Sequence, residues 1–367
     1  MTVGYYVHHQ GQGHASRAGA IAAELESPVT GLSSLPRPRD WAGDWVQLAR
    51  DDEGTEAIDP TAGGRLHWVP LGDRGLGERM AAIAGWIARE RPSAMVVDIS
   101  VEVVVLCRLL GVPVVTFALP GRRDDEPHSL GYDLATTVLA AWPDGIPPLS
   151  LGLTPVALAK LVPVGAISRF APVGAAARAS EVGATATLDG RASAGPRRVL
   201  LLAGGGGDGF EADAIDRARA STPGWTWDVL GGAAGRWSAD PWQSILAADV
   251  VITHAGQNAI AEVAAARRPA IVVPQPRPHD EQVTTAAALA AAGFPVLVLD
   301  DFAADDWSAL LDRALALPAA GWSRWNDSLG ATRAARAIER AAASSRASVP
   351  ASAPAPPSSL PSAAVIR

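Results

Sequence analysis

Residues 253–282 read THAGQNAIAEVAAARRPAIVVPQPRPHDEQ, and this stretch decides the fold. It begins where the apolar run Val250–Thr253 ends, and the next residues have helical periodicity over Asn258–Ala266. A second apolar run, Ala270–Val273, follows after a short loop. Strand, helix and strand in this order predict a βαβ unit with parallel strands.

The same alternation runs through most of the chain. Runs that are apolar on both faces predict further buried strands at Val3–Val7, Ala94–Val97, Val112–Ala118, Arg198–Ala203, Trp227–Leu230 and Pro295–Leu299. Helical periodicity lies between them at Ala15–Leu25, Leu76–Glu90, Val101–Leu110, Gly209–Ala220, Glu281–Ala292 and Trp307–Leu315. Repeated units of this kind predict the α/β class with doubly wound parallel sheets.

Length and local composition divide the chain into two halves. Its 367 residues exceed the roughly 250–300 that a single hydrophobic core usually holds. The alternation stops in an Ala-, Gly- and Arg-rich segment and then starts again with a new strand. We therefore predict Rossmann-like domains at 1–165 and 197–342, joined by a linker at 166–196. The Pro- and Ser-rich residues 343–367 predict a disordered tail.

Composition excludes several classes of protein. Hydrophobic residues make up 48% and charged residues 19%, which is typical of a globular chain. The net charge of −7 argues against nucleic-acid binding, which needs clustered Lys and Arg. A single cysteine, Cys107, excludes an internal disulfide and a thiolate metal cluster. The sequence contains no apolar run of the ~20 residues that a membrane span needs and no signal-peptide pattern, so we expect a cytoplasmic protein.

The first glycine-rich turn, HHQGQGHASR at residues 8–17, follows the first predicted strand. Gly11 and Gly13 allow the backbone to approach a ligand closely, and the following helix offers free N–H groups at its start. His14 lies at the carboxyl edge of the predicted sheet, where ligands bind in this class. A neutral histidine there can take a proton from a hydroxyl group, although a packed or capping histidine is an equally good interpretation.

The second glycine-rich turn is AGGGGDGF, residues 203–210. Consecutive glycines contribute no packing, so Gly204, Gly205 and Gly206 predict a close approach to a ligand.

The third turn combines glycine with polar side chains. A helix that begins near Asn258 can bind phosphate at its N-terminus, with His254 and Asn258 as donors and Gly256 in the turn. Glu262 lies one turn further along the same helix face, where a carboxylate can accept the hydroxyl groups of a ribose.

A later helix opens with Glu281 and Gln282 at the end of another strand, where polar groups suit sugar hydroxyls. For the acidic side chain, ordinary complementation of the helix dipole is an alternative.

The pattern His254-Ala-Gly256-Gln-Asn258-Ala-Ile-Ala-Glu262 resembles the donor-binding signature of GT-B glycosyltransferases that use UDP-sugars. The glycine turns resemble those of the peptidoglycan N-acetylglucosaminyltransferases of glycosyltransferase family 28, and the overall pattern is similar to UDP-glucuronosyl- and UDP-glucosyltransferases. The resemblance implies two facing Rossmann-like domains with acceptor binding in the first. The sequence differs from the signature at Gln257 and Ala259, so the resemblance does not identify a single subfamily.

The resemblance also implies site roles. His14 corresponds to the general base and Asp98 to the aspartate that orients it. His254 and Asn258 correspond to diphosphate contacts and Glu262 to the ribose contact. Glu281 and Gln282 correspond to contacts with the transferred sugar. We also assign Trp242 as a candidate partner of the nucleotide base.

The implied reaction is inverting, metal-independent transfer of a hexose or N-acetylhexosamine from a nucleotide sugar to an acceptor hydroxyl. The nucleotide sugar is a substrate, so no cofactor is expected. The acceptor stays open between a small molecule, a lipid-linked molecule and a glycan, and so does peripheral contact with the inner face of a membrane. Two alternatives also stay open: a UDP-N-acetylglucosamine 2-epimerase-like enzyme and a non-catalytic protein that binds sugar nucleotides.

Overall fold

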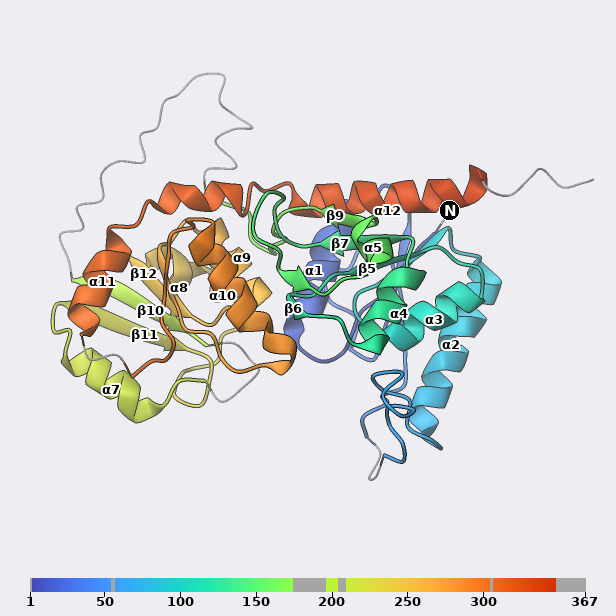
Figure 1. Ribbon diagram of the computed structural model, residues 1–367, viewed down its shortest axis with the longest axis horizontal. Helices are drawn as coiled ribbons and strands as arrows, with labels where there is room; N and C mark the ends of the chain where they lie inside the picture. Colours follow the sequence, from blue (N-terminus) through green and yellow to red (C-terminus); the bar gives the residue numbers. More distant parts are fainter. Residues whose placement is uncertain (1, 54–56, 174–195, 204–208, 304–305, 348–367) are drawn as a thin grey trace, which may run out of the picture.

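The computed structural model describes residues 2–53, 57–173, 196–203, 209–303 and 306–347. Two lobes lie side by side, and each contains a parallel sheet covered by helices (Figure 1). The α/β class and the two-lobed arrangement predicted from the sequence are therefore confirmed. The glycine run at 204–206, most of the predicted linker and the tail beyond residue 347 lie outside the described residues.

The first lobe is built on a seven-stranded parallel sheet in the order β3-β2-β1-β4-β5-β7-β9. The strands are β1 (Val3–Tyr6), β2 (Val29–Ser33), β3 (Asp44–Gln47), β4 (Ala94–Val97), β5 (Val114–Phe117), β7 (Thr137–Ala140) and β9 (Leu161–Pro163). A separate pair is formed by β6 (Gly121–Arg122) and β8 (Ser150–Leu151). The helices are α1 (Gln12–Ala22), α2 (Arg74–Glu90), α3 (Val101–Leu109), α4 (Glu126–Leu134) and α5 (Pro155–Leu158).

The second lobe has a five-stranded parallel sheet in the order β11-β10-β12-β13-β14. The strands are β10 (Arg197–Leu202), β11 (Trp225–Leu230), β12 (Val250–Thr253), β13 (Ala270–Val272) and β14 (Val296–Val298). Its helices are α7 (Ala212–Ala220), α8 (Trp242–Ala247), α9 (Gln257–Ala265), α10 (Glu281–Ala291) and α11 (Trp307–Leu315), with 3-10 turns η1 (Pro278–Asp280) and η2 (Ala319–Arg324).

The last helix, α12 (Gly330–Ala347), belongs structurally to the first lobe. In Figure 1 it runs from the second lobe along the edge of the first. Ile338 and Ala341 are buried in the same apolar cluster as Val3 and Tyr5 of β1. The sequence-based division, which placed residues up to 342 in the second domain, therefore differs from the packing at this helix. Burial of its apolar face against the first sheet explains why the chain crosses back.

The buried strands explain most of the agreement between sequence and structure. β1, β4 and β12 are buried along their whole length, and their apolar runs are visible in the sequence. Four strands of the first sheet were not predicted from the sequence: β2, β3, β7 and β9. β3 is only partly buried and has polar residues at both ends, so it carries no apolar run. The other three are short, and a short apolar segment does not by itself distinguish a strand from a loop or a helix.

Candidate functional site

The candidate site lies where the two sheets present the carboxyl ends of their strands to each other. In the first lobe, β1 and β4 are adjacent and parallel, with Tyr6 paired to Val97. The glycine-rich turn follows β1, and Asp98 follows β4 directly. Parallel pairing therefore brings His14 and Asp98 together although 84 positions separate them in the sequence.

A buried carboxylate holds the candidate base in place. Nδ1 of His14 contacts Oδ2 of Asp98, and Nε of Arg17 donates a hydrogen bond of 3.0 Å to the other carboxylate oxygen. Asp98 is fully buried, whereas the His14 side chain is 20% exposed. With Nδ1 directed to the carboxylate, Nε2 is the His14 nitrogen that can accept a proton.

The charge of Asp98 is stabilised by its partners. Burial alone raises the pKa of this carboxyl, but Arg17 and the His14 ring outweigh the burial and hold the pKa at about 2. The carboxylate therefore stays ionised at neutral pH and keeps its contact with His14.

In the second lobe, the turn after β12 leads into α9 with an open helix start. Gly256 is the N-cap and provides no side-chain cap, so the first N–H groups of the helix face the cleft. His254 lies beside this turn, with its ring stacked on Phe210 at a centroid distance of 4.2 Å. Nδ1 of His254 lies 2.8 Å from the carbonyl oxygen of Val273, so Nδ1 carries the hydrogen.

The two turns face each other across a hollow of about 200 Å³. His14 lines it from the first lobe, and Gly256, Asn258 and Glu281 line it from the second. The lobes are so close that a Cβ built on Gly13 would lie 1.7 Å from Nδ2 of Asn258. The structure thus brings the predicted base and the predicted phosphate-binding helix into one site.

His254 and Glu262 do not line this hollow. Glu262 is buried and forms an ion pair of 2.9 Å with Arg169. Burial raises the pKa of Glu262, and Arg169 opposes that shift. The adjacent Phe170 stacks on Trp242 at 4.6 Å, which covers one face of the predicted base-binding side chain. The role of His254 toward the diphosphate and the roles of Glu262 and Trp242 toward the rest of the nucleotide stay predictions.

Glu281 and Gln282 have different surroundings. Glu281 reaches the hollow, and its carboxylate lies 3.6 Å from the guanidinium of Arg123 in the other lobe. Gln282 is buried, and its side-chain oxygen accepts a hydrogen bond from the backbone of Gln275. The described contacts of Gln282 therefore hold the loop before α10, and a direct contact with a sugar stays a prediction.

Sequence analysis did not single out Arg17 or Arg169. Arg17 stands three residues after His14, one helical turn further along, so a charged partner could have been anticipated from that spacing. Arg169 lies in the predicted linker, far from Glu262 in sequence, and no local sequence pattern predicts the ion pair between them.

A larger cavity of about 430 Å³ opens in the first lobe beside the hollow. Ile99 and Leu119 line both spaces, so the two are adjacent. His279, in the η1 turn before α10, is a lining residue from the second lobe. Trp41 is buried against Tyr5 in the core and is not among the residues that line this cavity.

Comparison with known proteins places this site in context. Residues 239–307 match the glycosyltransferase family 28 C-terminal domain. A 61-residue segment is 44% identical to the UDP-N-acetylglucosamine–N-acetylmuramyl-(pentapeptide) pyrophosphoryl-undecaprenol N-acetylglucosamine transferase of Paenarthrobacter aurescens. That alignment spans 17% of this chain and 16% of the relative.

Solved structures of other proteins superpose on nearly the whole of this chain. The glycotransferase of kitacinnamycin superposes with a TM-score of 0.64 at 15% identity, covering 93% of this chain and 98% of that one. MurG of Acinetobacter baumannii gives 0.58 at 15% identity, with 92% and 99% covered. These matches confirm the GT-B fold and the resemblance to glycosyltransferases, and together with the family 28 domain they support sugar transfer as the enzyme class.

Within the described part of the chain, every helix is too short or too polar to cross a membrane.

Proposed function

We propose that the protein transfers a hexose or N-acetylhexosamine from a nucleotide sugar, a UDP-sugar in the first instance, to an acceptor hydroxyl with inversion and without a metal ion. The observation that carries the proposal is the position of His14, held by Asp98, opposite the open start of α9 across one hollow. Base and anion site are separated by the space in which a sugar would lie.

In the proposed reaction, Nε2 of His14 accepts the proton of the acceptor hydroxyl. The oxygen then forms a bond to the anomeric carbon while the bond from that carbon to the diphosphate oxygen breaks. A single displacement from the opposite face inverts the configuration. A positioned base contributes roughly 10²- to 10⁴-fold to such a rate. Asp98 keeps the His14 ring oriented and stabilises the imidazolium that forms.

The leaving diphosphate would be stabilised by the second lobe. The N–H groups at the start of α9 and the amide of Asn258 supply fixed dipoles where negative charge develops. Glu281 lies at the same hollow and is available to sugar hydroxyls. Fixed dipoles can perform the charge stabilisation that other enzymes obtain from a metal ion, which supports metal independence.

The test combines binding and turnover of the His14→Ala variant. UDP binding, measured by calorimetry, should stay within about twofold of wild type, while transfer falls by roughly 10²- to 10⁴-fold. Proton NMR of the product reports inversion through the anomeric coupling constant, and assays with EDTA test the metal requirement. Loss of UDP binding together with activity would contradict the assigned role of His14.

Two competing functions give different outcomes in the same assays. An epimerase would convert the UDP-sugar with no acceptor present. A non-catalytic binding protein would bind UDP but give no product with any acceptor. Cytoplasmic location belongs to the proposal as well. Peripheral membrane contact belongs to it only for a lipid-linked acceptor, the class that the name of the Paenarthrobacter relative gives.

A further inference from the structure

The 430 Å³ cavity of the first lobe is placed to hold the acceptor of the proposed reaction. It shares Ile99 and Leu119 with the hollow that contains His14. Much of its lining is apolar: Trp68, Leu76, Met80, Val101, Val104 and Phe117. A concave, partly apolar space with a few polar groups is typical of a site for a compact organic ligand.

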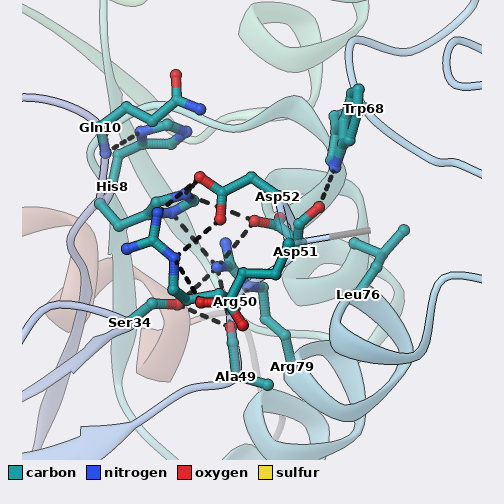
Figure 2. Close-up of polar contacts among 12 residues, drawn as sticks. His8, Gln10, Ser34, Ala49, Arg50, Asp51, Asp52, Trp68, Leu76 and Arg79 are labelled. Carbon is teal, nitrogen blue, oxygen red and sulfur yellow. Dashed lines mark hydrogen bonds and ion pairs between the residues drawn. The ribbon is translucent and has the colours of Figure 1, made fainter. Parts of the chain in front are cut away.

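Arg79 is one of two arginines that line the cavity, and each nitrogen of its guanidinium already has a partner within the protein (Figure 2). Its side chain is 2% exposed and forms an ion pair of 3.0 Å with Asp51. Its remaining hydrogen bonds go to the Ala49 carbonyl, Ser34 Oγ, Tyr6 Oη and His9 Nδ1. Every nitrogen of this guanidinium is therefore committed within the protein.

Arg123, the second lining arginine, is committed in the same way. Its Nε and Nη2 donate to the carbonyl oxygen of Pro120 at 3.0 and 2.7 Å. Its Nη1 lies 3.2 Å from Nε2 of His128, and Glu281 lies 3.6 Å away. Three of its five N–H groups thus have a partner, and an anionic ligand would have to compete with Glu281 for the charge of the guanidinium.

Two of the histidines that line the cavity, His8 and His128, are neutral at pH 7. Burial is the main cause that lowers the pKa of His8 to about 3 and that of His128 to about 4. Three acidic residues also line the cavity: Asp51, Asp52 and Glu102. The other three lining histidines, His9, His67 and His279, each lie within 3.6 Å of a carboxylate oxygen of Asp51, Asp52 or Asp125. A phosphate group would therefore have to compete with partners inside the protein for each of these histidines and for both arginines.

His8 offers the cavity a neutral hydrogen-bond donor. Its Nδ1 accepts a hydrogen bond of 3.2 Å from the backbone N–H of Gln10, so the hydrogen of the neutral ring is on Nε2. The ring is stacked on His9 and lies 5.6 Å from the His14 ring, centroid to centroid. A hydroxyl oxygen that accepts from His8 would thus lie near the proposed base.

We propose that the acceptor is a compact, uncharged and largely apolar molecule that enters this cavity with its hydroxyl group bound by His8, rather than a lipid pyrophosphate. This inference rests on the proposed function. A pyrophosphate would lose its hydration without gaining a cation, which is costly. An apolar ring system gains from burial, and its hydroxyl group can accept a hydrogen bond from Nε2 of His8.

Calorimetry without any donor tests the occupant. The probes are 1-naphthol, its hydroxyl-free analogue 1-methylnaphthalene, and geranyl pyrophosphate. We expect 1-naphthol to bind the wild-type protein. The Met80→Trp substitution places a larger side chain in the cavity and should raise the Kd of 1-naphthol at least tenfold. Leu109→Trp is the matched control, because Leu109 is exposed and outside the cavity lining. Geranyl pyrophosphate should not bind in the cavity, so any binding that it shows should be equally strong in wild type and in Met80→Trp.

The His8→Phe variant tests the bound hydroxyl group, because phenylalanine keeps a ring but removes the donor. Wild type should prefer 1-naphthol over 1-methylnaphthalene by about fivefold or more, and His8→Phe should bind both equally, as expected for one hydrogen bond of ~1 kcal/mol. An unchanged preference would contradict the role of His8.

Binding of geranyl pyrophosphate that Met80→Trp weakens, or failure of both neutral probes to bind, would overturn the proposed acceptor class. These outcomes are separate from the donor site, because UDP binding and the effect of His14→Ala are measured without these probes. Failure of sugar transfer would remove the proposed function and leave the binding results standing.

Discussion

The turns after β1 and β12 have the same local construction and different chemistry. Each follows a buried parallel strand, contains glycine and leads into a helix that points its start at the cleft. In the first lobe the histidine contacts an ionised carboxylate, Asp98. In the second lobe the histidine contacts a backbone carbonyl, that of Val273, and an aromatic ring.

The neighbouring strand causes the difference. β4 lies beside β1 and is followed by a buried aspartate, whose carboxylate contacts Nδ1 of His14. β13 lies beside β12 and supplies only a carbonyl oxygen, and burial lowers the pKa of His254. In the proposed reaction, the same fold element would therefore provide a proton acceptor in one lobe and an anion site in the other, according to the group that the neighbouring strand supplies.

Replacement of Asp98 should have the largest effect on this comparison. Asp98→Asn removes the negative charge that orients His14 and leaves the buried Arg17 without its counter-ion. We expect transfer to fall by roughly 10²- to 10⁴-fold and the free energy of unfolding to fall by about 3–5 kcal/mol. Steady-state kinetics and urea denaturation measure the two effects.

Glu262→Gln is the matched control, because Glu262 also pairs with an arginine but lies in the donor lobe. It should raise the KM for the donor and change kcat little. If Asp98→Asn also acted only on KM, the two lobes would not differ in the way described.

Substitution of Gly13 tests how closely the turns approach each other. Gly13→Ala places a methyl group where the Asn258 amide lies, so the lobes or the amide must shift. A displacement of about 1 Å at a reacting centre can cost roughly 10²-fold in rate, and we expect kcat to fall by about that amount. Thermal unfolding should be unaffected or improved, because alanine favours the helix that Gly13 occupies.

Two further variants separate the lobe contact from helix effects. Gly19→Ala lies in the same helix, and its added Cβ would meet nothing within 4 Å, so its activity should stay at wild-type level. In an Asn258→Ala background, Gly13→Ala should cost much less than it does alone. Equal costs in both backgrounds would show that the close contact with Asn258 is not the cause.

The smallest expected effect is a pH dependence of UDP affinity that comes from His254. In the free protein Nδ1 donates to Val273, so Nε2 has no hydrogen and can contact a phosphate oxygen only after protonation. In the proposed complex, diphosphate would raise the pKa of His254 above its value in the free protein, which burial lowers. UDP binding then takes up a proton between these two values, so affinity falls as the pH rises, by at most about tenfold per pH unit.

Calorimetry in buffers of different ionisation enthalpy counts the protons taken up. His254→Gln keeps a side-chain donor but does not titrate, so it isolates the contribution of UDP itself. The idea fails if wild type and His254→Gln take up the same number of protons across the pH range.

Part of the site could be predicted because its residues are close in sequence. The spacing of Gly256 and Asn258 after an apolar strand predicts an open helix start, and the structure shows one. The family resemblance implied that Asp98 orients His14, and the two side chains are in contact in the structure; their catalytic roles stay predictions. Arg169 could not be predicted as the partner of Glu262, because a long-range ion pair leaves no periodic signal.

Apolar periodicity and glycine spacing are local properties of the chain, so they were enough to predict the α/β class, the strands of the two main sheets except β2, β3, β7 and β9, and the three glycine-rich turns. Three features follow only from the folded structure: α12 returns to the first lobe, the two turns face each other, and both arginines of the large cavity have hydrogen-bond or ion-pair partners within the protein. Those features depend on contacts between residues far apart in the chain, and such contacts form only when the sheets assemble and bury their apolar faces.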